Sequence, residues 1–427
     1  MEIRDPIHGP ITLSPAETLL VDSPYLQRLR NIKQLGFSEL TFPGASHSRF
    51  LHSLGAMHLA GVAFDAVLRD APWLPAAERA RLRQTVRLAA LCHDLGHPPL
   101  SHSSEVLLPP SSQLHIPGVQ WHKGGDHGSH EAFTLQFLLN SGLTDLLRQA
   151  LHQDGIAPGD IAALISDEVA CDPAVFQVGS RNLHGLLASL VSSELDVDRM
   201  DYLLRDSYFT GVSYGKFDVE WLISHLCHFE GEGGQLHLGL EDRAIFTFDD
   251  FLLSRHHMFL MVYFHKKSVC YDHMLRRFYA QYPEYCRAPA DPEDYLHFDD
   301  HALWRVLRGK ARDSQWAHGI LQRKPLQMLA ESTPSGPEPI DALVERLQTE
   351  GIDHLRVASK GALSKYQATE RGIYVRKKPP VGQPVWTELG QATQLFLRYA
   401  EHTVLERIYV WPTDVAVAGG WLQQLRG

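Results

Sequence analysis

The sequence predicts a mainly α-helical protein with a small α+β lobe at its C-terminal side. Apolar residues recur at helical spacing through the first two thirds of the chain, and Gly and Pro separate these stretches. Alternating apolar residues of strand type recur after residue 340. With 427 residues, of which 44% are hydrophobic, the chain is long enough for one large core and a smaller second domain.

Helices dominate the expected order of elements. Helical spacing of apolar residues covers residues 15–35, 47–70, 76–95, 129–152, 183–208 and 216–229. The alternating stretch 235–240 predicts a small hairpin, and a helix is expected again over 249–282. Segment 109–126 contains Pro and Gly residues and predicts a loop, which is either a plain surface loop or a lid.

The C-terminal part predicts a different kind of structure. Segment 331–339 is rich in Pro, Ser and Gly and is the best candidate for a linker. Beyond it, the pattern predicts two strands and an intervening helix, at 373–376, 408–411 and 390–401. We therefore expect one domain over 1–330 and a small α+β lobe over 340–427.

Composition limits the location and the partners of the protein. Forty Lys and Arg against fifty Asp and Glu give a net charge of −10, which opposes nonspecific attraction to nucleic acid or anionic membranes. The five cysteines form no C-x-x-C pair. The start of the chain has no signal-type apolar stretch, and no window approaches the ~18 apolar residues of a membrane span. We expect a cytoplasmic protein with no membrane partner, for which nucleic acid is not expected as a ligand.

The pair His93-Asp94 is the strongest chemical signal in the sequence, because two good metal ligands lie side by side where an apolar helix ends. Neighbouring helical side chains diverge by roughly 100°, so such a pair needs further ligands from other helices. His52 and Asp198 can supply them. Each of these residues alone would more commonly be a buried histidine or a helix cap. Together they predict a metal site.

The order His52, His93-Asp94, Asp198 resembles the signature of the HD phosphohydrolase superfamily. Four further motifs occur in the order and spacing of the HD-domain deoxynucleoside triphosphate triphosphohydrolases, at residues 5–9, 27–36, 42–50 and 263–266. Within that family the chain is most similar to the enzymes that carry an additional SAM domain, although we expect no SAM domain here. The resemblance is dense over residues 5–280, implies an HD-domain helical fold, and makes 1–330 the expected phosphohydrolase domain.

The resemblance implies a divalent metal ion, which could be Fe, Mn, Mg, Zn or Ni, held by His52, His93, Asp94 and Asp198. Such an ion suits phosphoester hydrolysis because it polarises a phosphoryl oxygen and activates water. By the same resemblance His97 contacts the phosphate and His102 donates a proton to the leaving group, supported by His130 and Glu105, where the family has Asp. Without the resemblance, His97 and His102 could equally be residues that stabilise a turn.

A pocket for a deoxynucleotide is also implied. Gln34 and Leu35 match the pair that holds the 3′-hydroxyl and packs where a 2′-hydroxyl would lie. The expected contacts to phosphate, sugar and base are Arg49, His97, Arg199, Tyr202, Asp206, Arg255 and Tyr263. Spacing alone puts Asp198, Arg199, Tyr202 and Asp206 close to one helical face, and Arg255, Phe259 and Tyr263 on another. For the second set, an ordinary amphipathic core face is the alternative.

Five residues match positions at which the family binds an activating guanine nucleotide between subunits: Asp22, Gln27, Arg30, Lys266 and Arg323. A helix cap and ordinary surface roles are the alternatives for the first three. We expect a homo-oligomer, a dimer or a tetramer, that hydrolyses deoxynucleoside triphosphates to deoxynucleoside and triphosphate. The rival functions are another HD phosphohydrolase, such as a nucleotidase or cyclic-nucleotide phosphodiesterase, and a non-catalytic regulator that binds nucleotides or nucleic acid.

Overall fold

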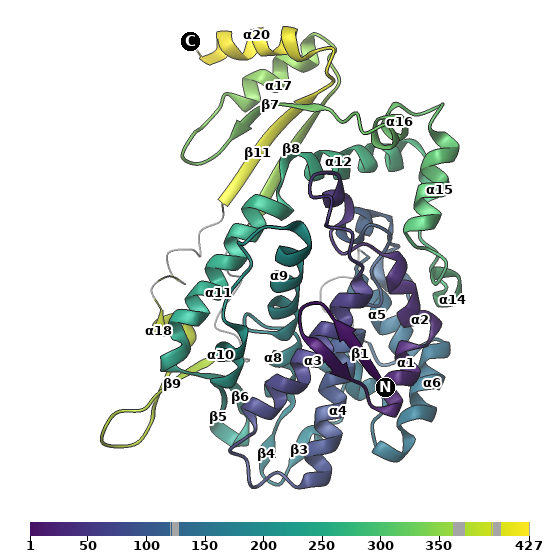
Figure 1. Cartoon of the computed structure of the whole chain (residues 1–427). Helices are drawn as coiled ribbons and strands as arrows, with labels where there is room; N and C mark the ends of the chain where they lie inside the picture. The colour runs from purple at the N-terminus through teal and green to yellow at the C-terminus, as the bar shows by residue number, and fades with distance from the viewer. Residues whose placement is uncertain (120, 122–127, 362–371, 394, 396–402, 427) are drawn as a thin grey trace.

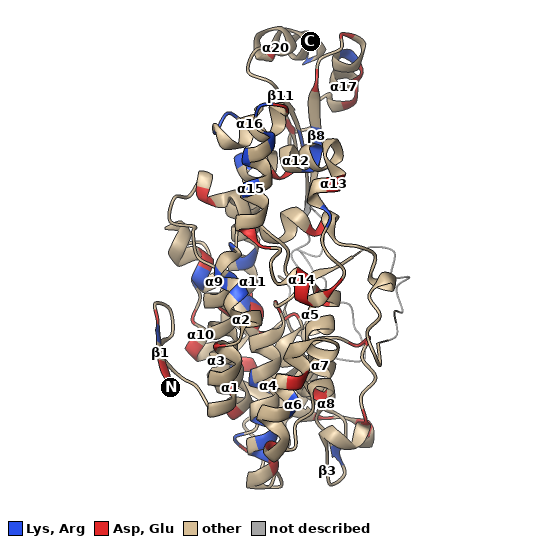
Figure 2. Ribbon diagram, turned by 90° about the vertical axis from the view of Figure 1, so that its right-hand side faces the viewer, with Lys and Arg blue, Asp and Glu red and all other residues tan. Residues whose placement is uncertain are grey.

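Helices make up most of the protein in a computed structural model that describes residues 1–119, 121, 128–361, 372–393, 395 and 403–426. The fold is mainly α with a small α+β lobe, as the sequence predicts. The lobe projects from one end of a long helical body and carries the C-terminus (Figure 1). Acidic and basic side chains are interspersed along the length of the molecule (Figure 2).

The helices of the body follow the predicted segments, with more breaks than expected. In chain order they are α1 (Pro15–Val21), α2 (Pro24–Arg28), α3 (Arg49–Val67), α4 (Ala76–Cys92), α5 (His130–Leu139), α6 (Gly142–Leu151), α7 (Pro158–Ile165), α8 (His184–Val191), α9 (Val197–Thr210), α10 (Val219–Ser224), α11 (Ile245–Met258), α12 (Lys266–Gln281), α13 (Pro283–Cys286), α14 (Pro292–Tyr295), α15 (Asp300–Lys310) and α16 (Gln315–Leu321). The breaks have local causes. Ser23 and Ser141 accept hydrogen bonds from the first turns of α2 and α6, so each begins a new helix.

The predicted continuous helix over 249–282 is divided in two. A π-helical turn, Phe259–Tyr263, follows α11, and the His265 side chain caps the start of α12. A π-helical turn changes the angular spacing of side chains, so residues before and after it do not share one face as they would in a regular helix.

Helix α3 is the centre of the body and packs against α4 and α9. A Cβ atom on Gly55 would lie 1.9 Å from the Asp201 carboxylate, so only glycine allows this approach of α3 to α9. Contrary to the sequence expectation, α3 is long and apolar enough to match a membrane span, but 72% of its apolar window is buried inside the protein. We therefore assign it to the core.

Eleven strands form small sheets in the described part of the chain: β1 (Glu2–Asp5), β2 (Gly9–Thr12), β3 (Gln177–Val178), β4 (Arg181–Asn182), β5 (Leu226–Glu230), β6 (Leu236–Glu241), β7 (Gln327–Ser332), β8 (His354–Gly361), β9 (Tyr374–Lys377), β10 (Val385–Glu388) and β11 (Thr403–Val410). The expected hairpin is formed by β5 and β6. We predicted a helix over 216–229, but the end of this segment forms strand β5.

The lobe is built on a three-stranded antiparallel sheet with β11 between β7 and β8. Helices α17 (Ile340–Thr349) and α20 (Val415–Arg426) pack beside this sheet. The predicted linker 331–339 begins inside β7, so it is only partly a linker. The boundary between the predicted domains remains a prediction.

Strand β9 lies outside the lobe sheet, although we expected residues 373–376 to belong to the lobe. It pairs in parallel with β6 of the body, and Val375 is buried in the core of the body. Arg376 forms an ion pair with Glu241 of β6, which adds a cross-strand attraction. Of the helix predicted over 390–401, only α18 (Leu389–Ala392) is a described helix, and residues 394 and 396–401 lie outside the described part. Part of the predicted loop 109–126 also lies outside it.

Candidate active site

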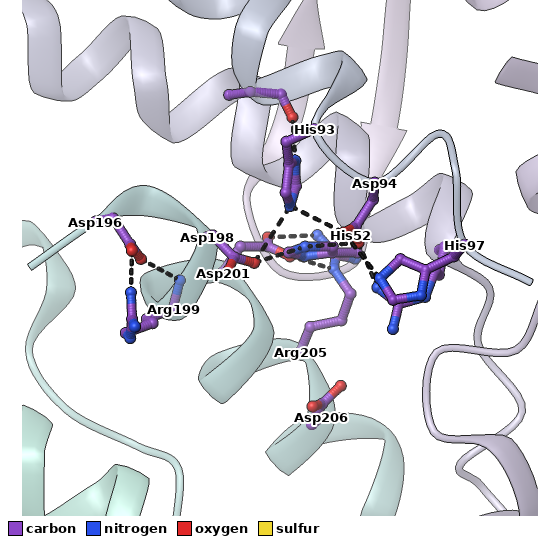
Figure 3. A network of polar contacts seen from close by, with 12 residues as sticks. His52, His93, Asp94, His97, Asp196, Asp198, Arg199, Asp201, Arg205 and Asp206 are labelled. Atoms are coloured by element: carbon purple, nitrogen blue, oxygen red, sulfur yellow. Dashed lines mark hydrogen bonds and ion pairs between the residues drawn. The ribbon is translucent and has the colours of Figure 1, made fainter. Parts of the chain in front are cut away.

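The four predicted metal ligands come together from three helices. His52 lies in the first turns of α3, His93 and Asp94 follow the end of α4, and Asp198 lies in the first turn of α9 (Figure 3). The Asp198 carboxylate lies 2.9 Å from Nε2 of His52 and 3.4 Å from Nε2 of His93. The His93 Nε2 atom also lies 3.4 Å from the Asp94 carboxylate. Donor atoms of both histidines and both carboxylates therefore face one small volume.

The chemistry of this cluster fits a divalent cation. Nε2 of His52 and Nε2 of His93 are buried and make no well-aligned hydrogen bond within the described part of the chain. Burial alone would lower the pKa of His52, but the carboxylates of Asp198 and Asp201 raise this pKa to about 10. The cluster therefore favours a positive charge, and a mixed set of imidazole and carboxylate donors suits a transition-metal ion.

Hydrogen bonds on the far side of each ring fix which nitrogen can bind a metal. Nδ1 of His93 lies 2.8 Å from the carbonyl oxygen of Ala90, and Nδ1 of His52 lies 2.8 Å from the Asp201 carboxylate. A carbonyl or a carboxylate accepts a hydrogen bond, so each Nδ1 donates its proton, and each Nε2 is the nitrogen that can lose its proton and bind a metal.

Asp201 is the centre of a buried network that the sequence analysis did not assign to the site. Its carboxylate accepts two hydrogen bonds from Arg205, at 2.8 and 2.9 Å, and lies 2.6 Å from Nε2 of His8. Arg205 also pairs with Asp5 at 2.9 Å and is fully buried. The motif at residues 5–9 was a signal for this network, because it places both Asp5 and His8 in the resemblance.

Arg49 connects the cluster of predicted metal ligands to the turn that follows His93-Asp94. Its guanidinium pairs with Asp94, and its Nε donates to the Ser101 hydroxyl at 2.7 Å. Burial would raise the pKa of Asp94, but Arg49, His93 and His97 hold it well below its usual value. Asp94 is therefore ionised, as a ligand must be.

Three histidines and one glutamate form a second group beside the first. The rings of His97 and His130 are stacked with centroids 3.8 Å apart, and Nδ1 of His130 is hydrogen-bonded to Glu105. Nδ1 of His102 lies 3.3 Å from the same carboxylate. Burial would raise the pKa of Glu105, but His102 and His130 lower it, so Glu105 is an anion that holds both rings. The longer Glu arm thus reaches both histidines.

The turn between these groups has a strained backbone. Leu100 and Ser101 have φ values of 54° and 57°, a left-handed conformation that residues other than glycine rarely adopt. The backbone N–H of Leu100 donates to Asp300 at 2.7 Å, and the Tyr295 hydroxyl donates to the carbonyl of Gly96 at 2.8 Å. Residues from α14 and α15 therefore hold the turn in place.

Two adjoining cavities lie over the cluster. The smaller, of about 260 Å³, contains the predicted ligands His93, Asp94 and Asp198. The larger has a volume of about 370 Å³. Four residues line both cavities, which therefore adjoin: Gln34, Arg49, His102 and Tyr202. Three further residues predicted to bind substrate line only the larger one: Leu35, Asp206 and Tyr263. The Tyr263 hydroxyl donates to Asp206 at 2.8 Å, and His47 contacts the other oxygen of that carboxylate.

Two arginines predicted to contact substrate do not line either cavity. Arg199 pairs with Asp196 at the start of α9 and points away from the cluster (Figure 3). It follows Asp198 directly, so its side chain diverges by roughly 100° around the helix. Arg255 is buried and pairs with Glu194 at 2.6 Å. Spacing put Arg199 and Arg255 on two helical faces beside other expected substrate contacts, and their contact with substrate stays a prediction.

The predicted activator residues fall into two groups. Asp22, Gln27 and Arg30 lie around α1 and α2, where Arg30 donates to the Gln27 side chain at 2.7 Å. Lys266 begins α12, and Arg323 follows α16, which packs on α12. Figure 1 shows α12 and α16 at the lobe end of the body, away from α1.

Comparisons with known proteins agree with the motifs. No family model matches the chain. An uncharacterized protein from Methanocaldococcus jannaschii is 32% identical over 306 residues, which cover 72% of this chain and 54% of the relative. The human deoxynucleoside triphosphate triphosphohydrolase SAMHD1 is 29% identical over 364 residues, which cover 78% of this chain and 55% of the enzyme. The chain spans about half the length of these curated relatives.

A solved structure extends the similarity to nearly the whole fold. The crystal structure of a hypothetical protein from Aquifex aeolicus has a TM-score of 0.75 and 27% sequence identity, with 98% of this chain and 99% of that chain covered. The motifs, the relatives and the fold together assign this chain to the HD-domain family that includes the deoxynucleoside triphosphate triphosphohydrolases.

Proposed function

We propose that the protein is a metal-dependent phosphohydrolase that converts deoxynucleoside triphosphates to deoxynucleoside and inorganic triphosphate. One observation carries this proposal. The cavity that contains the histidine and aspartate cluster adjoins a larger cavity and shares four lining residues with it, and the predicted sugar contacts Gln34 and Leu35 line that larger cavity. A nucleotide can therefore extend from the cluster, where its α-phosphate reacts, into the larger cavity, where the nucleoside lies.

A divalent ion held by His52, His93, Asp94 and Asp198 would supply Lewis acidity toward a phosphoryl oxygen and toward water. Water attacks the α-phosphorus, and the bond from phosphorus to the 5′ oxygen breaks. His102 lines both cavities, and its proton goes to the leaving 5′ oxygen. Glu105 and His130 hold the His102 ring for this transfer, while Arg49 and His97 contact the phosphate.

Sugar selection rests on Gln34 and Leu35. The Oε1 atom of Gln34 is buried without a hydrogen-bond partner among the described residues, so it can accept a hydrogen bond from a 3′-hydroxyl. Leu35 offers only apolar surface beside the sugar. A ribonucleotide would place its 2′-hydroxyl against this surface at a cost of about 1–3 kcal/mol. Deoxyribonucleotides are therefore the proposed substrates.

Arg199 and Arg255 keep their proposed role as contacts to the triphosphate, although each now pairs with a carboxylate. A bound triphosphate offers several anionic oxygens in place of one carboxylate, and the planar guanidinium of Arg can donate hydrogen bonds to two of these oxygens at once. The proposal therefore includes movement of both side chains when substrate binds.

Activation by a nucleotide is a second part of the proposal, separate from the reaction at the active site. We propose that Asp22, Gln27 and Arg30 of one subunit form a guanine-nucleotide site with Lys266 and Arg323 of other subunits, in a dimer or tetramer. A ligand that binds only the assembled form stabilises that form by mass action. Light scattering with and without GTP, repeated on Arg30→Ala, tests this. A protein that stays monomeric and fully active in both conditions removes the activator site from the proposal.

The central experiment is incubation of metal-replete protein with each dNTP and NTP, singly and in mixtures, with identification of the products. Inorganic triphosphate as the product supports the proposal. Orthophosphate would indicate a nucleotidase, and hydrolysis restricted to cyclic nucleotides would indicate a phosphodiesterase. Asp94→Ala is the control, because it removes a proposed ligand that ends a helix rather than fills the core. A lack of all turnover would favour a nucleotide-binding regulator.

A further inference from the structure

The larger cavity has a polar wall that the proposed reaction leaves unused. Ser268 and Asp272 of α12 line this cavity and do not line the smaller cavity at the histidine cluster. They are four residues apart, so their side chains lie on one face of the helix. Both therefore face the part of the cavity into which the nucleoside extends.

Both side chains have hydrogen-bonding capacity that the protein does not use. Ser268 is 4% exposed, and its hydroxyl has no hydrogen-bond partner among the described residues. A buried hydroxyl without a partner is costly, so such a group usually awaits a ligand or water. The Asp272 carboxylate accepts one hydrogen bond, from Ser103 at 2.6 Å on Oδ1. Its other oxygen has no hydrogen bond or ion pair to any described residue.

Asp272 acts as an acceptor in neutral solution. Burial raises the pKa of this carboxyl to about 6, although the Ser103 hydroxyl and Arg276 oppose the rise. A group with this pKa is mostly ionised above neutral pH. An ionised carboxylate only accepts hydrogen bonds, so it attracts N–H donors and repels carbonyl oxygens.

Aromatic rings beside this wall suit a flat ligand. Phe259, Tyr263 and Phe264 line the same cavity. The rings of Phe259 and Tyr263 lie 5.1 Å apart in an edge-to-face arrangement, and those of Phe259 and Phe264 lie 5.5 Å apart. Aromatic faces stack on any nucleobase, so the rings provide affinity and leave the choice of base to the polar groups.

We propose that Asp272 and Ser268 read the edge of the base and select bases that carry an exocyclic amino group. This inference rests on the proposed function, which places the phosphates in the smaller cavity and hence the base in the larger one. The amino group of cytosine or adenine donates to Asp272, and the Ser268 hydroxyl donates to the neighbouring ring nitrogen. Guanine offers two donors to the carboxylate. Uracil and thymine place a carbonyl oxygen where cytosine carries its amino group.

The sharpest test compares dCTP with dUTP, which differ only at positions 3 and 4 of the base. The expected ratio of kcat/KM is at least about tenfold in favour of dCTP, because a carbonyl facing the Asp272 carboxylate leaves both acceptors unpaired. Asp272→Asn keeps the size of the side chain and adds an N–H donor, so it should bring this ratio close to one. Asp160→Asn is the control, since it changes a buried carboxylate that lines neither cavity.

Equilibrium binding of dCTP and dUTP to metal-free protein separates this inference from the proposed function. If dNTPs yield triphosphate but dCTP and dUTP are used equally, base selection is wrong and the activity stands. If no dNTP is hydrolysed, the activity is wrong, and the binding ratio in wild type and Asp272→Asn decides base selection alone. Thermal unfolding checks that the variants fold. If Asp272→Asn does not fold, Ser268→Ala replaces it and should reduce the ratio about threefold or more. An unchanged ratio in the folded variant overturns the inference.

Discussion

Replacing Asp201 by Asn should weaken metal binding although Asp201 is not a metal ligand. Its carboxylate accepts the Nδ1 proton of His52 at 2.8 Å, which orients the ring and makes Nε2 a stronger donor. An amide in the same place is a weaker acceptor and carries no charge. Loss of a partner of this kind lowers metal affinity by about 10- to 100-fold, which corresponds to about 1.4–2.7 kcal/mol of binding free energy.

The same substitution also lowers stability, so a matched control is needed. Asp201 and Asp5 both pair with the fully buried Arg205, but only Asp201 contacts His52. Asp5→Asn and Asp201→Asn should each reduce the free energy of unfolding of the metal-free protein by about 1.5–3 kcal/mol, the usual contribution of a hydrogen bond to a charged group. Metal affinity should fall only in Asp201→Asn.

The assay is competition for metal against a chelator of known affinity, with unfolding of the metal-free protein followed by circular dichroism. Element analysis of the purified variants gives an independent measure of bound metal. Equal metal affinities for wild type and Asp201→Asn would refute the argument that Asp201 positions the His52 ring. Equal losses in the two variants would mean that general destabilisation, and not the hydrogen bond to His52, weakens the site.

Three further predictions address catalysis, sugar choice and stability. His102→Ala should lower kcat by about 10²- to 10⁴-fold with little change in KM, because a proton donor acts mainly in the transition state; steady-state kinetics measure this, and a rise in KM alone would make His102 a binding residue. Leu35→Ala should bring the kcat/KM values of dGTP and GTP closer together, and an unchanged ratio would mean that the sugar is read elsewhere. Glu17→Gln leaves the buried Arg87 without its ion pair and should cost about 3–5 kcal/mol of stability at pH 7. Burial would raise the pKa of Glu17, but Arg87 lowers it below 4.5 in the folded protein. The ion pair therefore stabilises the protein fully above pH 4.5, and this contribution is lost as the pH falls through the pKa of Glu17 in the folded state. Urea denaturation should therefore show a difference between wild type and Glu17→Gln that shrinks below pH 4.5, and a constant difference would contradict the assignment.

Local signals in the sequence predicted much of the fold. Helix α3 is rich in apolar residues on nearly all sides because it is buried in the core, where it packs on α4, and the hairpin of β5 and β6 has a short connection. The position of β9 could not be predicted in this way. It depends on pairing with β6, more than a hundred residues earlier in the chain, and the alternation of apolar residues in a strand does not identify its partner.

The site shows the same division between local and distant information. The cluster of side chains was predictable because His52, His93-Asp94 and Asp198 lie in distinctive local motifs. The pair of Asp196 and Arg199, three residues apart, was a local signal that the spacing argument did not use. The partner of Arg255 was not predictable, because Glu194 lies 61 residues earlier in the chain. Asp272 was missed for a related reason. Its role depends on α12 packing beside the turn at Ser103, and a lone Asp in an amphipathic helix gives no such signal.

The hydrogen bonds between the strained turn and residues of α14 and α15 define how much of the chain a working fragment needs. The dense motifs end near residue 280, and a fragment cut there would contain every proposed ligand. It would nevertheless lose Tyr295 and Asp300, which hold the backbone at Gly96 and Leu100. Without these two hydrogen bonds, Leu100 and Ser101 lose part of what offsets their backbone strain and should relax toward ordinary φ values. Boundaries for expression or domain grafting should therefore lie beyond α15, well past the last recognisable motif.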